Sequence, residues 1–237
     1  MITQAVVAAA GRGTRMGDLT RDRPKHLIPV NGKPFLYYLL SDLVKAGYKD
    51  LVVVAGYHAD MVGDFLKEYF PSAQLVNQFE ILGAEKYGTA CTVQCVSEMV
   101  GARPFVMVYG DNLYSVADLA RMNRDDGFHA VAGMRHDHPE QYGVLLHEGE
   151  MLQRIVEKPK TFVGDLINTG LYTFTSEIFS ALVGLDVSVR GEYELTDAVS
   201  FLAQQGKVKI VTLVDFWMDF GKPVDIPVLE AFLKKRK

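Results

Sequence analysis

The sequence predicts an α/β protein with a Rossmann-like, mixed and mostly parallel sheet that is flanked by helices on both faces. Short and almost continuously apolar runs alternate with longer amphipathic segments, which is typical of buried strands joined by helical crossovers. The chain has 237 residues, of which 49% are hydrophobic and 23% charged. This size and composition suit one globular domain with a substantial core, so we expect a single domain over residues 1–237.

The first half of the chain contains the repeated strand–helix alternation. Pro34 suits the start of a helix, and Gly47 suits the position just past a helix end. Helical spacing of apolar residues is found at 35–46, 59–70 and 89–100. Apolar runs typical of strands are found at 5–10, 50–57, 73–77, 104–111 and 129–134. Because such alternation places consecutive strands in parallel, we expect a parallel sheet here.

The second half has a different pattern. A hairpin is expected at 142–160, with its turn near Glu148 and Gly149. Residues 166–174 are expected to form another strand, and 207–221 one or two strands. Helices are expected near 175–183, near 193–205 and from Val224 onward. We expect both halves to share one sheet, with a nucleotide-binding half over about 1–112 and an acceptor-binding half over about 113–237.

Charge and cysteine content exclude several classes of partner. The net charge of −4 gives no general attraction for nucleic acid, so any anion must be bound by local charge. The apolar run near the N-terminus lacks a basic leader and is too short for a signal or a membrane span. We therefore expect a cytoplasmic protein with no membrane partner. Cys91 and Cys95 are expected to be small buried hydrophobic residues, because no further ligands accompany them.

A loop rich in glycine and positive charge follows the first apolar run, with the sequence AAAGRGTRMGDLTRDRPKHLIPV at 8–30. Glycines allow the backbone to approach a ligand closely, and their N–H groups can point at phosphate oxygens. Arg15 offers a planar fork of donors, and Lys25 offers a compact point charge. Together these features predict a site for a polyphosphate.

Two common phosphate-binding motifs do not match this loop. A dinucleotide fold would need a third glycine where Met16 stands, and a helix that begins at once. Pro24 and Pro29 instead keep the segment irregular. A P-loop would need a lysine followed by serine or threonine after the glycines, and neither pair is present. The third interpretation is a nucleotidyltransferase loop.

The loop resembles the signature of the sugar-1-phosphate nucleotidyltransferases, G-x-G-T-R-[LM]-x-P-x-T-x-x-x-P-K-x-x-x-P-V. Asp18 departs from it, where many members have proline. The resemblance implies the fold of nucleotide-diphospho-sugar transferases and a loop that wraps a nucleoside triphosphate. The nucleotide-binding residues that it implies here are Ala10, Gly11, Gly13, Thr14, Arg15 and Lys25.

Further motifs continue the resemblance along the chain. The quoted segments are YGTACTV (87–93), VYGDN (108–112), QYGVL (141–145), VEKPK (156–160), NTGLYTF (168–174), GEYELTDAV (191–199) and WMDFGKPVDI (217–226). They imply that Gly88 and Thr89 lie against the base. They also imply that Asp111 and Asp219 hold Mg²⁺, which prefers hard oxygen ligands and needs only one or two carboxylates. The implied sugar-phosphate-binding residues are Tyr142, Gly143, Glu157, Lys158, Asn168 and Thr169.

The segment before the base turn, NQFEILGAEKYGTA, is longer than is usual in the family. The residue that reads the base is therefore open among Gln78, Glu80 and Glu85, and with it the identity of the base. Isolated aspartates at strand ends such as Asp111 also often do no more than cap turns. The combination of motifs favours metal binding for Asp111 and Asp219.

The resemblance implies attack by a sugar-1-phosphate oxygen on the α-phosphorus of the triphosphate, with pyrophosphate as the leaving group. Positioning and charge neutralisation carry most of such catalysis, and we expect Arg15, Lys25, Asp111 and Lys158 to supply them with Mg²⁺. Glucose 1-phosphate with dTTP or UTP is the expected pair. The alternatives are cytidylyl or guanylyl transfer to another phosphorylated sugar or polyol, and a non-catalytic sensor subunit. Many relatives are dimers or tetramers, so a homo-oligomer is compatible with this interpretation.

Overall fold

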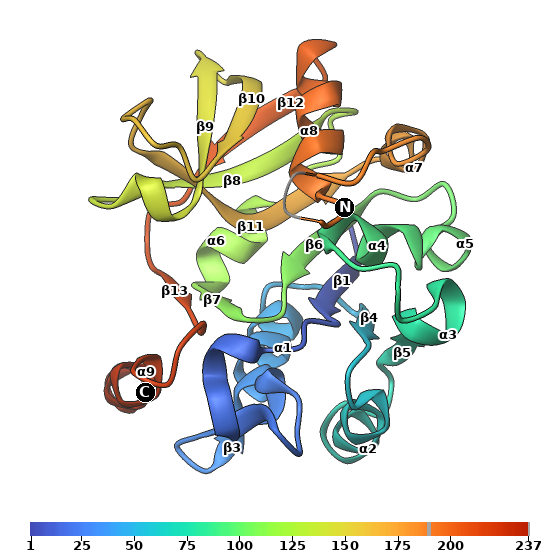
Figure 1. The fold of residues 1–237 in the computed structure, drawn as a ribbon, viewed down its shortest axis with the longest axis vertical. Coiled ribbons are helices and arrows are strands. Elements are labelled where there is room, and N and C mark those ends of the chain that lie inside the picture. Colours follow the sequence, from blue (N-terminus) through green and yellow to red (C-terminus); the bar gives the residue numbers. More distant parts are fainter. Residues whose placement is uncertain (189–190, 237) are drawn as a thin grey trace.

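The computed structural model describes residues 1–188 and 191–236. A central nine-stranded sheet has the order β5-β4-β1-β6-β11-β8-β12-β10-β9, and helices cover both of its faces (Figure 1). The expected mixed α/β architecture is confirmed. No helix in the described ranges is both long and apolar enough to span a bilayer.

The strands that the first half contributes to the central sheet are all parallel to their neighbours within that half. They are β1 (Gln4–Ala9), β4 (Asp50–Ala55), β5 (Gln74–Asn77) and β6 (Phe105–Tyr109). Helices α1 (Phe35–Lys45) and α2 (Ala59–Tyr69) form the crossovers between them. Side chains of β1 alternate between the two faces, so that Val7 joins one core cluster and Val6 the other. Burial on both faces explains why these strands are almost continuously apolar.

The second half extends the same sheet mainly by antiparallel pairing. β11 (Leu166–Phe174) pairs antiparallel with β6 and with β8 (His129–Arg135), so it joins the two halves. β9 (Gly143–Glu148) and β10 (Met151–Glu157) form the expected hairpin. β12 (Val208–Thr212) runs parallel to β8. In Figure 1, β8, β9, β10 and β12 fill the upper part of the view, and β11 lies below them, next to β6 of the first half.

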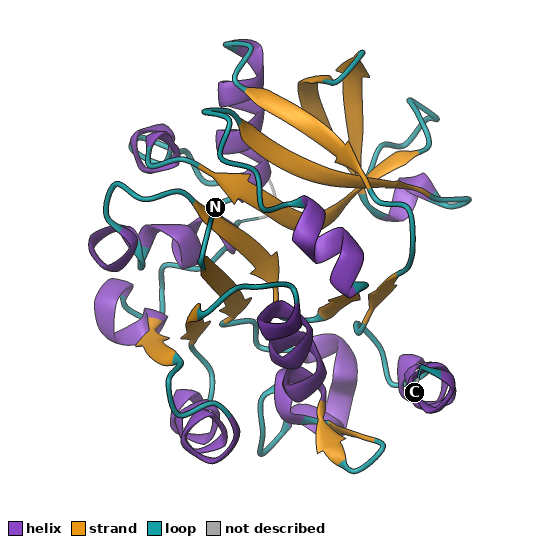
Figure 2. Cartoon of the chain, turned by 180° about the vertical axis from the view of Figure 1, so that it is seen from behind, coloured by secondary structure: helices purple, strands orange, loops and turns teal. Residues whose placement is uncertain are grey.

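The helices divide between the two faces of the sheet. α1, α2, α6 (Val116–Arg121) and α9 (Asp225–Lys235) contribute to one core cluster. α4 (Thr89–Gln94), α7 (Glu177–Ala181) and α8 (Leu195–Gln204) contribute to the other. Figure 2 shows the opposite side of the molecule, where the C-terminal helix lies at the same end as the small β2–β3 hairpin. That hairpin consists of β2 (Pro29–Val30) and β3 (Lys33–Pro34).

The helix expected over residues 89–100 is interrupted in the structure. Residues 89–100 form α4 and α5 (Ser97–Val100), with a break at Val96, whose φ of −103° and ψ of 3° are not helical. Val93, Val96 and Val100 nevertheless all enter the same core cluster. The apolar spacing was therefore preserved across a turn in the backbone, which periodicity alone does not reveal.

The strand expected at 104–111 ends at Tyr109, and the chain then begins a second, short strand. This β7 (Asn112–Tyr114) leaves the main sheet and pairs with β13 (Trp217–Asp219). The segment 207–221 therefore forms two strands in two different sheets. Helix α3 (Gln78–Leu82) and the 3₁₀ helices Thr14–Thr20, Lys25–Leu27 and Pro139–Gln141 were not expected from the sequence.

Candidate active site

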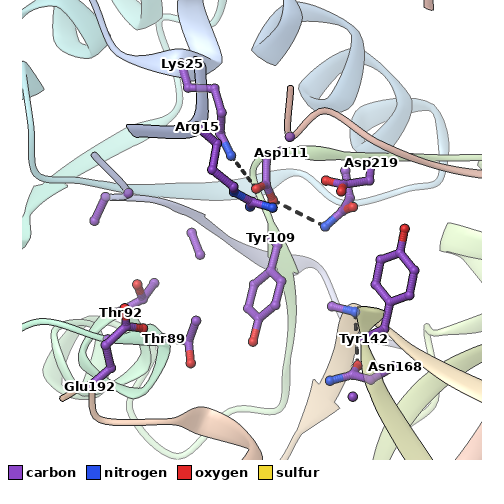
Figure 3. A pocket seen from close by; sticks show the side chains of 18 of the residues that line it. Arg15, Lys25, Thr89, Thr92, Tyr109, Asp111, Tyr142, Asn168, Glu192 and Asp219 are labelled. Atoms are coloured by element: carbon purple, nitrogen blue, oxygen red, sulfur yellow. Dashed lines mark hydrogen bonds and ion pairs between the residues drawn. The ribbon is translucent and has the colours of Figure 1, made fainter. Parts of the chain in front are cut away.

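A cleft with a volume of about 540 Å³ opens where β1, β6 and β10 end, beside residues 168–170 of β11. Parallel α/β sheets bind ligands at this edge, outside the carboxyl ends of their strands. This cleft is lined by the residues predicted from the sequence to bind the nucleotide, the acceptor and the metal ion. Figure 3 shows part of its wall. These predicted residues are Ala10, Gly11, Gly13, Thr14, Arg15, Lys25, Gln78, Gly88, Thr89, Asp111, Tyr142, Gly143, Glu157, Lys158, Asn168, Thr169 and Asp219.

The glycine-rich loop is folded against itself. Gly13 has a φ of +65°, and a Cβ atom there would lie 2.9 Å from the Cβ of Lys25 and 3.1 Å from Cγ2 of Thr20. The Thr20 hydroxyl donates a hydrogen bond to the carbonyl of Gly13 over 3.2 Å. Gly13 is therefore needed for both its backbone conformation and its lack of a side chain. This packing brings Lys25, which is only 6% exposed, to the wall of the cleft.

Lys25 and Asp111 form an ion pair, with Nζ of the lysine 2.5 Å from Oδ2 of the aspartate. Burial would raise the pKa of Asp111, but the charge and hydrogen bond of Lys25 outweigh it and leave the pKa below its usual value. The neighbouring His26 is 2% exposed, and burial together with Lys25 lowers its pKa to about 3. His26 is therefore neutral at physiological pH.

A second carboxylate reaches the same place from the other half of the chain. β13 pairs with β7 so that Asp219 stands opposite Asn112, and the N–H of Phe220 donates to the carbonyl of Asp111 over 2.8 Å. Burial raises the pKa of Asp219 to about 6, and the negative charge of Asp111 adds to this rise. The two-stranded sheet therefore holds two carboxylates close enough to repel each other.

This pair of carboxylates fits a hard divalent cation such as Mg²⁺. Mg²⁺ commonly takes one or two carboxylates and keeps several waters. Among the described residues, no group of three or more His, Cys, Asp or Glu gathers at one point, as a site made of protein ligands alone would need. A cation between Asp111 and Asp219 would also offset the repulsion that raises the pKa of Asp219.

The turn around Gly88 is fixed by a segment of the second half. The N–H of Tyr193 donates to the carbonyl of Tyr87, and the N–H of Ala90 donates to the carbonyl of Tyr193, both over 3.0 Å. Gly88 has a φ of +138°, and a Cβ atom there would lie only 2.3 Å from the Tyr193 oxygen. Two stretches of backbone therefore meet at Gly88 without room for a side chain.

The three candidates for reading the base lie in different places. Gln78 is buried at the start of α3 and lines the cleft, where its Oε1 accepts a hydrogen bond from the Thr92 hydroxyl over 3.4 Å. Glu80 accepts a hydrogen bond from Asn77 and lines a separate cavity. Glu85 is exposed. Of the three, Gln78 has the position from which a bound base could be contacted.

The acceptor end of the cleft is built by the β9–β10 hairpin and by β11. The N–H of Lys158 donates to the carbonyl of Tyr142 over 3.0 Å, and Lys158 has a φ of +44°. Gly143 lies against Glu157, because a Cβ atom there would approach Oε1 of the glutamate to 2.9 Å. The rings of Tyr142 and Trp217 pack edge to face, with centroids 5.3 Å apart. These contacts fix the backbone on which Lys158 and Glu157 are carried.

Several lining residues were not singled out from the sequence. Tyr109 precedes the Gly110–Asp111 pair, but its aromatic ring was counted as part of an apolar strand. Trp217 lies inside a quoted motif without having been assigned a role. The other lining residues of this kind are Ala8, His26, Tyr87, Thr92, Asn112, Gln141, Gly170, Glu192, Glu194 and Gly221.

Comparison with known proteins agrees with this site along nearly the whole chain. The sequence profile of the nucleotidyl transferase family matches residues 4–236. A UTP–glucose-1-phosphate uridylyltransferase of Haloferax volcanii is 33% identical, over 98% of this chain and 97% of that protein. A bifunctional sugar-1-phosphate nucleotidylyltransferase/acetyltransferase of Sulfurisphaera tokodaii is 31% identical over 94% of this chain. This chain covers 53% of the length of that bifunctional relative.

Solved structures give the same result. A Bacillus anthracis protein assigned as a glucose-1-phosphate thymidylyltransferase superposes with a TM-score of 0.84 and 26% identity, over 97% of this chain and 94% of that one. A UDP-glucose pyrophosphorylase bound to UDP-glucose superposes with a TM-score of 0.86 over the full length of both chains, and at 22% identity it supports the fold alone. The resemblance stated from the motifs is confirmed: the chain belongs to the nucleotidyl transferase family, among its sugar-1-phosphate nucleotidyltransferase enzymes.

Proposed function

We propose that this enzyme transfers a nucleotidyl group from UTP or dTTP to glucose 1-phosphate in a Mg²⁺-dependent reaction. An acceptor phosphate oxygen forms a bond to the α-phosphorus as the bond from that phosphorus to the β-phosphate oxygen breaks. The products are a nucleoside-diphosphate sugar and pyrophosphate. The observation that carries this proposal is the single cleft in which Lys25, Asp111 and Asp219 face Lys158 and the glycine-rich loop.

Both reactants are anions, so the main task of the protein is to bring negative charges together. We assign Arg15 and Lys25 to the triphosphate and Lys158 to the acceptor phosphate, because they enter the cleft from different elements. Backbone N–H groups of Gly11 and Gly13 can add hydrogen bonds to phosphate oxygens. Asp111 and Asp219 would hold Mg²⁺, which when bound neutralises charge on the phosphates. Positioning and electrostatic stabilisation of this kind suffice for phosphoryl-type transfers.

The two halves divide this task. Residues up to about 112 supply the glycine-rich loop, Gln78, the Gly88 turn and Asp111, which we assign to the nucleotide and the metal. Residues after about 112 supply Tyr142, Glu157, Lys158 and Asn168, which we assign to the sugar phosphate. Gln78 is our choice for the base reader, because an amide can pair with both a donor and an acceptor of a pyrimidine edge.

The expected substrates are those for which two relatives are named. The Haloferax volcanii relative is named for UTP and glucose 1-phosphate, and the Bacillus anthracis protein for thymidylyl transfer to glucose 1-phosphate. Uracil and thymine differ only by a methyl group. A pocket that reads their common edge would accept both unless packing excludes that methyl.

The test measures pyrophosphate release from purified protein with each of ATP, CTP, GTP, UTP and dTTP. Glucose 1-phosphate is the first acceptor, followed by mannose, galactose, N-acetylglucosamine and polyol phosphates. We expect release with UTP or dTTP and glucose 1-phosphate, and loss of that release in EDTA with recovery on added Mg²⁺. Faster release with CTP or GTP, or with another acceptor, would replace the proposed substrates. Undiminished release in EDTA would remove the metal from the proposal.

A further inference from the structure

Strand β11 is irregular where it borders the cleft. It advances from Asn168 to Tyr172 while its neighbour β8 advances only from Gly133 to Val131. The extra residues form a bulge in β11, which we define as residues 168–170, and all three line the cleft. Bulges recur beside active sites, where they re-aim a side chain. The backbone of β11 therefore leaves the regular ladder at the place that we assign to the acceptor.

From one face of the sheet, the bulge is held by the hydroxyl of Tyr114. This hydroxyl donates to the carbonyl oxygen of Thr169 over 2.6 Å, and both residues are buried. Tyr114 belongs to β7, which begins directly after Asp111 and pairs with β13, the strand that carries Asp219. The hydrogen bond therefore fixes the bulge relative to the two carboxylates.

From the opposite face, the hydroxyl of Tyr172 holds the side chain of the first bulge residue. Nδ2 of Asn168 donates to this hydroxyl over 2.6 Å. Oδ1 of Asn168 accepts the N–H of Gly170 over 3.0 Å, which is the dashed line at Asn168 in Figure 3. An amide held at both polar atoms cannot rotate by half a turn without losing both bonds. Its second N–H and its second lone pair remain for a ligand in the cleft.

Both tyrosine rings are fully buried in apolar surroundings. Tyr114 packs in the core cluster of one face of the sheet, and Tyr172 in that of the other. A phenylalanine would fill either position with the same ring, and a buried hydroxyl is costly unless it is hydrogen-bonded. Each hydroxyl has a hydrogen bond to the bulge. What the two hydroxyls add to the core is therefore a fixed geometry for the bulge.

We propose that Tyr114 and Tyr172 are positioning residues for the acceptor. Their hydroxyls hold the bulge from the two faces of the sheet and keep the Asn168 amide oriented toward the cleft. This inference rests on the proposed function, because it takes Asn168 to contact the sugar phosphate. Tyr114 also sets the place of that contact relative to Asp111 and Asp219.

The first test is Tyr172→Phe, which keeps the ring in the core and removes only the hydroxyl. We expect the KM for the sugar 1-phosphate to rise roughly five- to tenfold, as loss of one hydrogen bond predicts. The KM for the triphosphate should change by less than about twofold, because Gln78 and the Gly88 turn are carried by other elements. Equal changes in both constants, or no change in either, would overturn the proposal for Tyr172.

The second test is Tyr114→Phe, which leaves the Thr169 carbonyl without its donor. The acceptor KM should again rise roughly five- to tenfold, because the bulge is no longer anchored. The affinity for Mn²⁺, measured by electron paramagnetic resonance, should stay within about twofold of the wild-type value, since the backbone pairing of β7 with β13 is untouched. A loss of Mn²⁺ affinity as large as the rise in acceptor KM would show that Tyr114 acts on the carboxylates, which contradicts the proposal.

Tyr48→Phe is the matched control. The Tyr48 hydroxyl is fully buried and donates to the Leu119 carbonyl over 2.8 Å, so it makes the same kind of bond as Tyr114. Neither Tyr48 nor Leu119 lines the cleft. We expect a lower Tm and unchanged KM values. A rise in acceptor KM equal to that of the other two variants would show that their effect is a general loss of stability, and would overturn the proposal.

A double-mutant cycle tests whether Tyr172 acts through Asn168. In an Asn168→Ala background, Tyr172→Phe should have little further effect on the acceptor KM, because the amide that it orients is gone. Coupling of the two substitutions would support the proposal. Additive effects would mean that Tyr172 acts independently of Asn168, which contradicts it.

Calorimetric titration with glucose 1-phosphate keeps this inference separate from the reaction itself. If the wild-type protein released no pyrophosphate with any pair of substrates, the proposed function would fail, but binding could still be compared. Weaker binding to Tyr114→Phe and Tyr172→Phe than to the wild type and Tyr48→Phe supports the positioning role. Equal binding to all four proteins, or binding to none, overturns it.

Discussion

Nζ of Lys25 lies 2.5 Å from Oδ2 of Asp111, although 86 positions separate the two residues in the sequence. The lysine follows the glycine-rich loop, and the aspartate follows the central strand β6. Their pairing fixes the loop to the sheet at the point where a triphosphate and a cation would meet. Asp111 would therefore have two partners, Lys25 within the fold and the cation that we propose.

Asp111→Asn should lower pyrophosphate release by at least about 100-fold, because a charged ligand for the cation is lost. It should also lower the free energy of unfolding by roughly 2–3 kcal/mol, since the largely buried Lys25 loses its counter-charge. Steady-state kinetics and urea unfolding measure the two effects. The exposed pair between Asp64 and Lys67 provides the control, because Asp64→Asn should change neither quantity. Near-normal turnover of Asp111→Asn would remove this residue from the metal site.

The pH dependence of metal binding should follow Asp219. Burial and the charge of Asp111 raise the pKa of Asp219 to about 6, so this carboxyl takes up a proton as the pH falls below 6. A protonated carboxyl binds Mg²⁺ poorly, so apparent Mg²⁺ affinity should fall by about tenfold per pH unit below that point and level off above it.

Titration with Mn²⁺, followed by electron paramagnetic resonance between pH 5 and pH 8, measures this dependence directly. Asp219→Asn should bind the ion weakly at every pH and lose the inflection near the pKa of about 6. An inflection that persisted unchanged in this variant would assign the titration to another group.

The sequence predicted the strands of the first half well, for a physical reason. β1, β4 and β6 are buried on both faces, so their apolar character is continuous and unlike that of the neighbouring helices. The prediction of one continuous helix over residues 89–100 was wrong, because core-facing side chains such as Val93 and Val96 keep their helical spacing even where the backbone leaves the helix. Periodicity reports which side chains face the core and says little about the path between them.

The cleft was predicted mainly by its motifs, and what the motifs missed depends on tertiary contact. Asp219 reaches Asp111 through pairing of β13 with β7, two strands too short to be recognised from composition. The place of Tyr109 depends on the absence of a side chain at Gly170, which no local pattern reveals. The sequence likewise does not reveal that α3 places Gln78, and not Glu80, in the cleft where a base could be contacted.

Asp225 should control metal binding without contacting the metal. Its Oδ2 accepts the N–H of Gly221 over 2.8 Å and that of Lys222 over 2.6 Å, which fixes the loop that follows Asp219. Asp225→Ala releases this loop, so the Mg²⁺ concentration for half-maximal activity should rise about tenfold, with a parallel loss of Mn²⁺ affinity. Asp225→Asn retains an oxygen acceptor and should recover most of the effect. Equal metal requirements for the alanine variant and the wild type would show that the loop needs no such support.

His129 should make the fold sensitive to acid. It is 1% exposed, burial lowers its pKa to about 4, and its Nδ1 accepts the N–H of Thr175 over 3.3 Å. Between a pKa of about 6.5 in the unfolded chain and about 4 in the fold, the unfolded state binds more protons. Stability is therefore complete above the higher value and falls as the pH drops, by about 2 kcal/mol between pH 7 and pH 5.

Urea unfolding at several pH values measures that contribution as a difference between variants. His129→Gln should show a smaller loss of stability between pH 7 and pH 5 than the wild type. His138→Gln, at an exposed position, should keep the wild-type dependence. Identical pH dependence in all three proteins would show that His129 does not carry this acid sensitivity.

Gly88→Ala tests whether the nucleotide turn depends on the segment from the second half. Its new Cβ atom would lie 2.3 Å from the Tyr193 oxygen, so the two stretches of backbone must separate and lose the bonds from Tyr193 to Tyr87 and from Ala90 to Tyr193. The KM for the triphosphate should rise at least about tenfold, because the turn is no longer held where the base would lie. Gly127→Ala is the matched control, since Gly127 also has a positive φ (+82°) but has no atom within 4 Å of its would-be Cβ. Backbone strain alone would affect both variants equally in thermal stability, whereas loss of the Tyr193 contact raises the triphosphate KM only in Gly88→Ala. If both variants kept the wild-type KM, the contact between the halves would have no part in nucleotide binding.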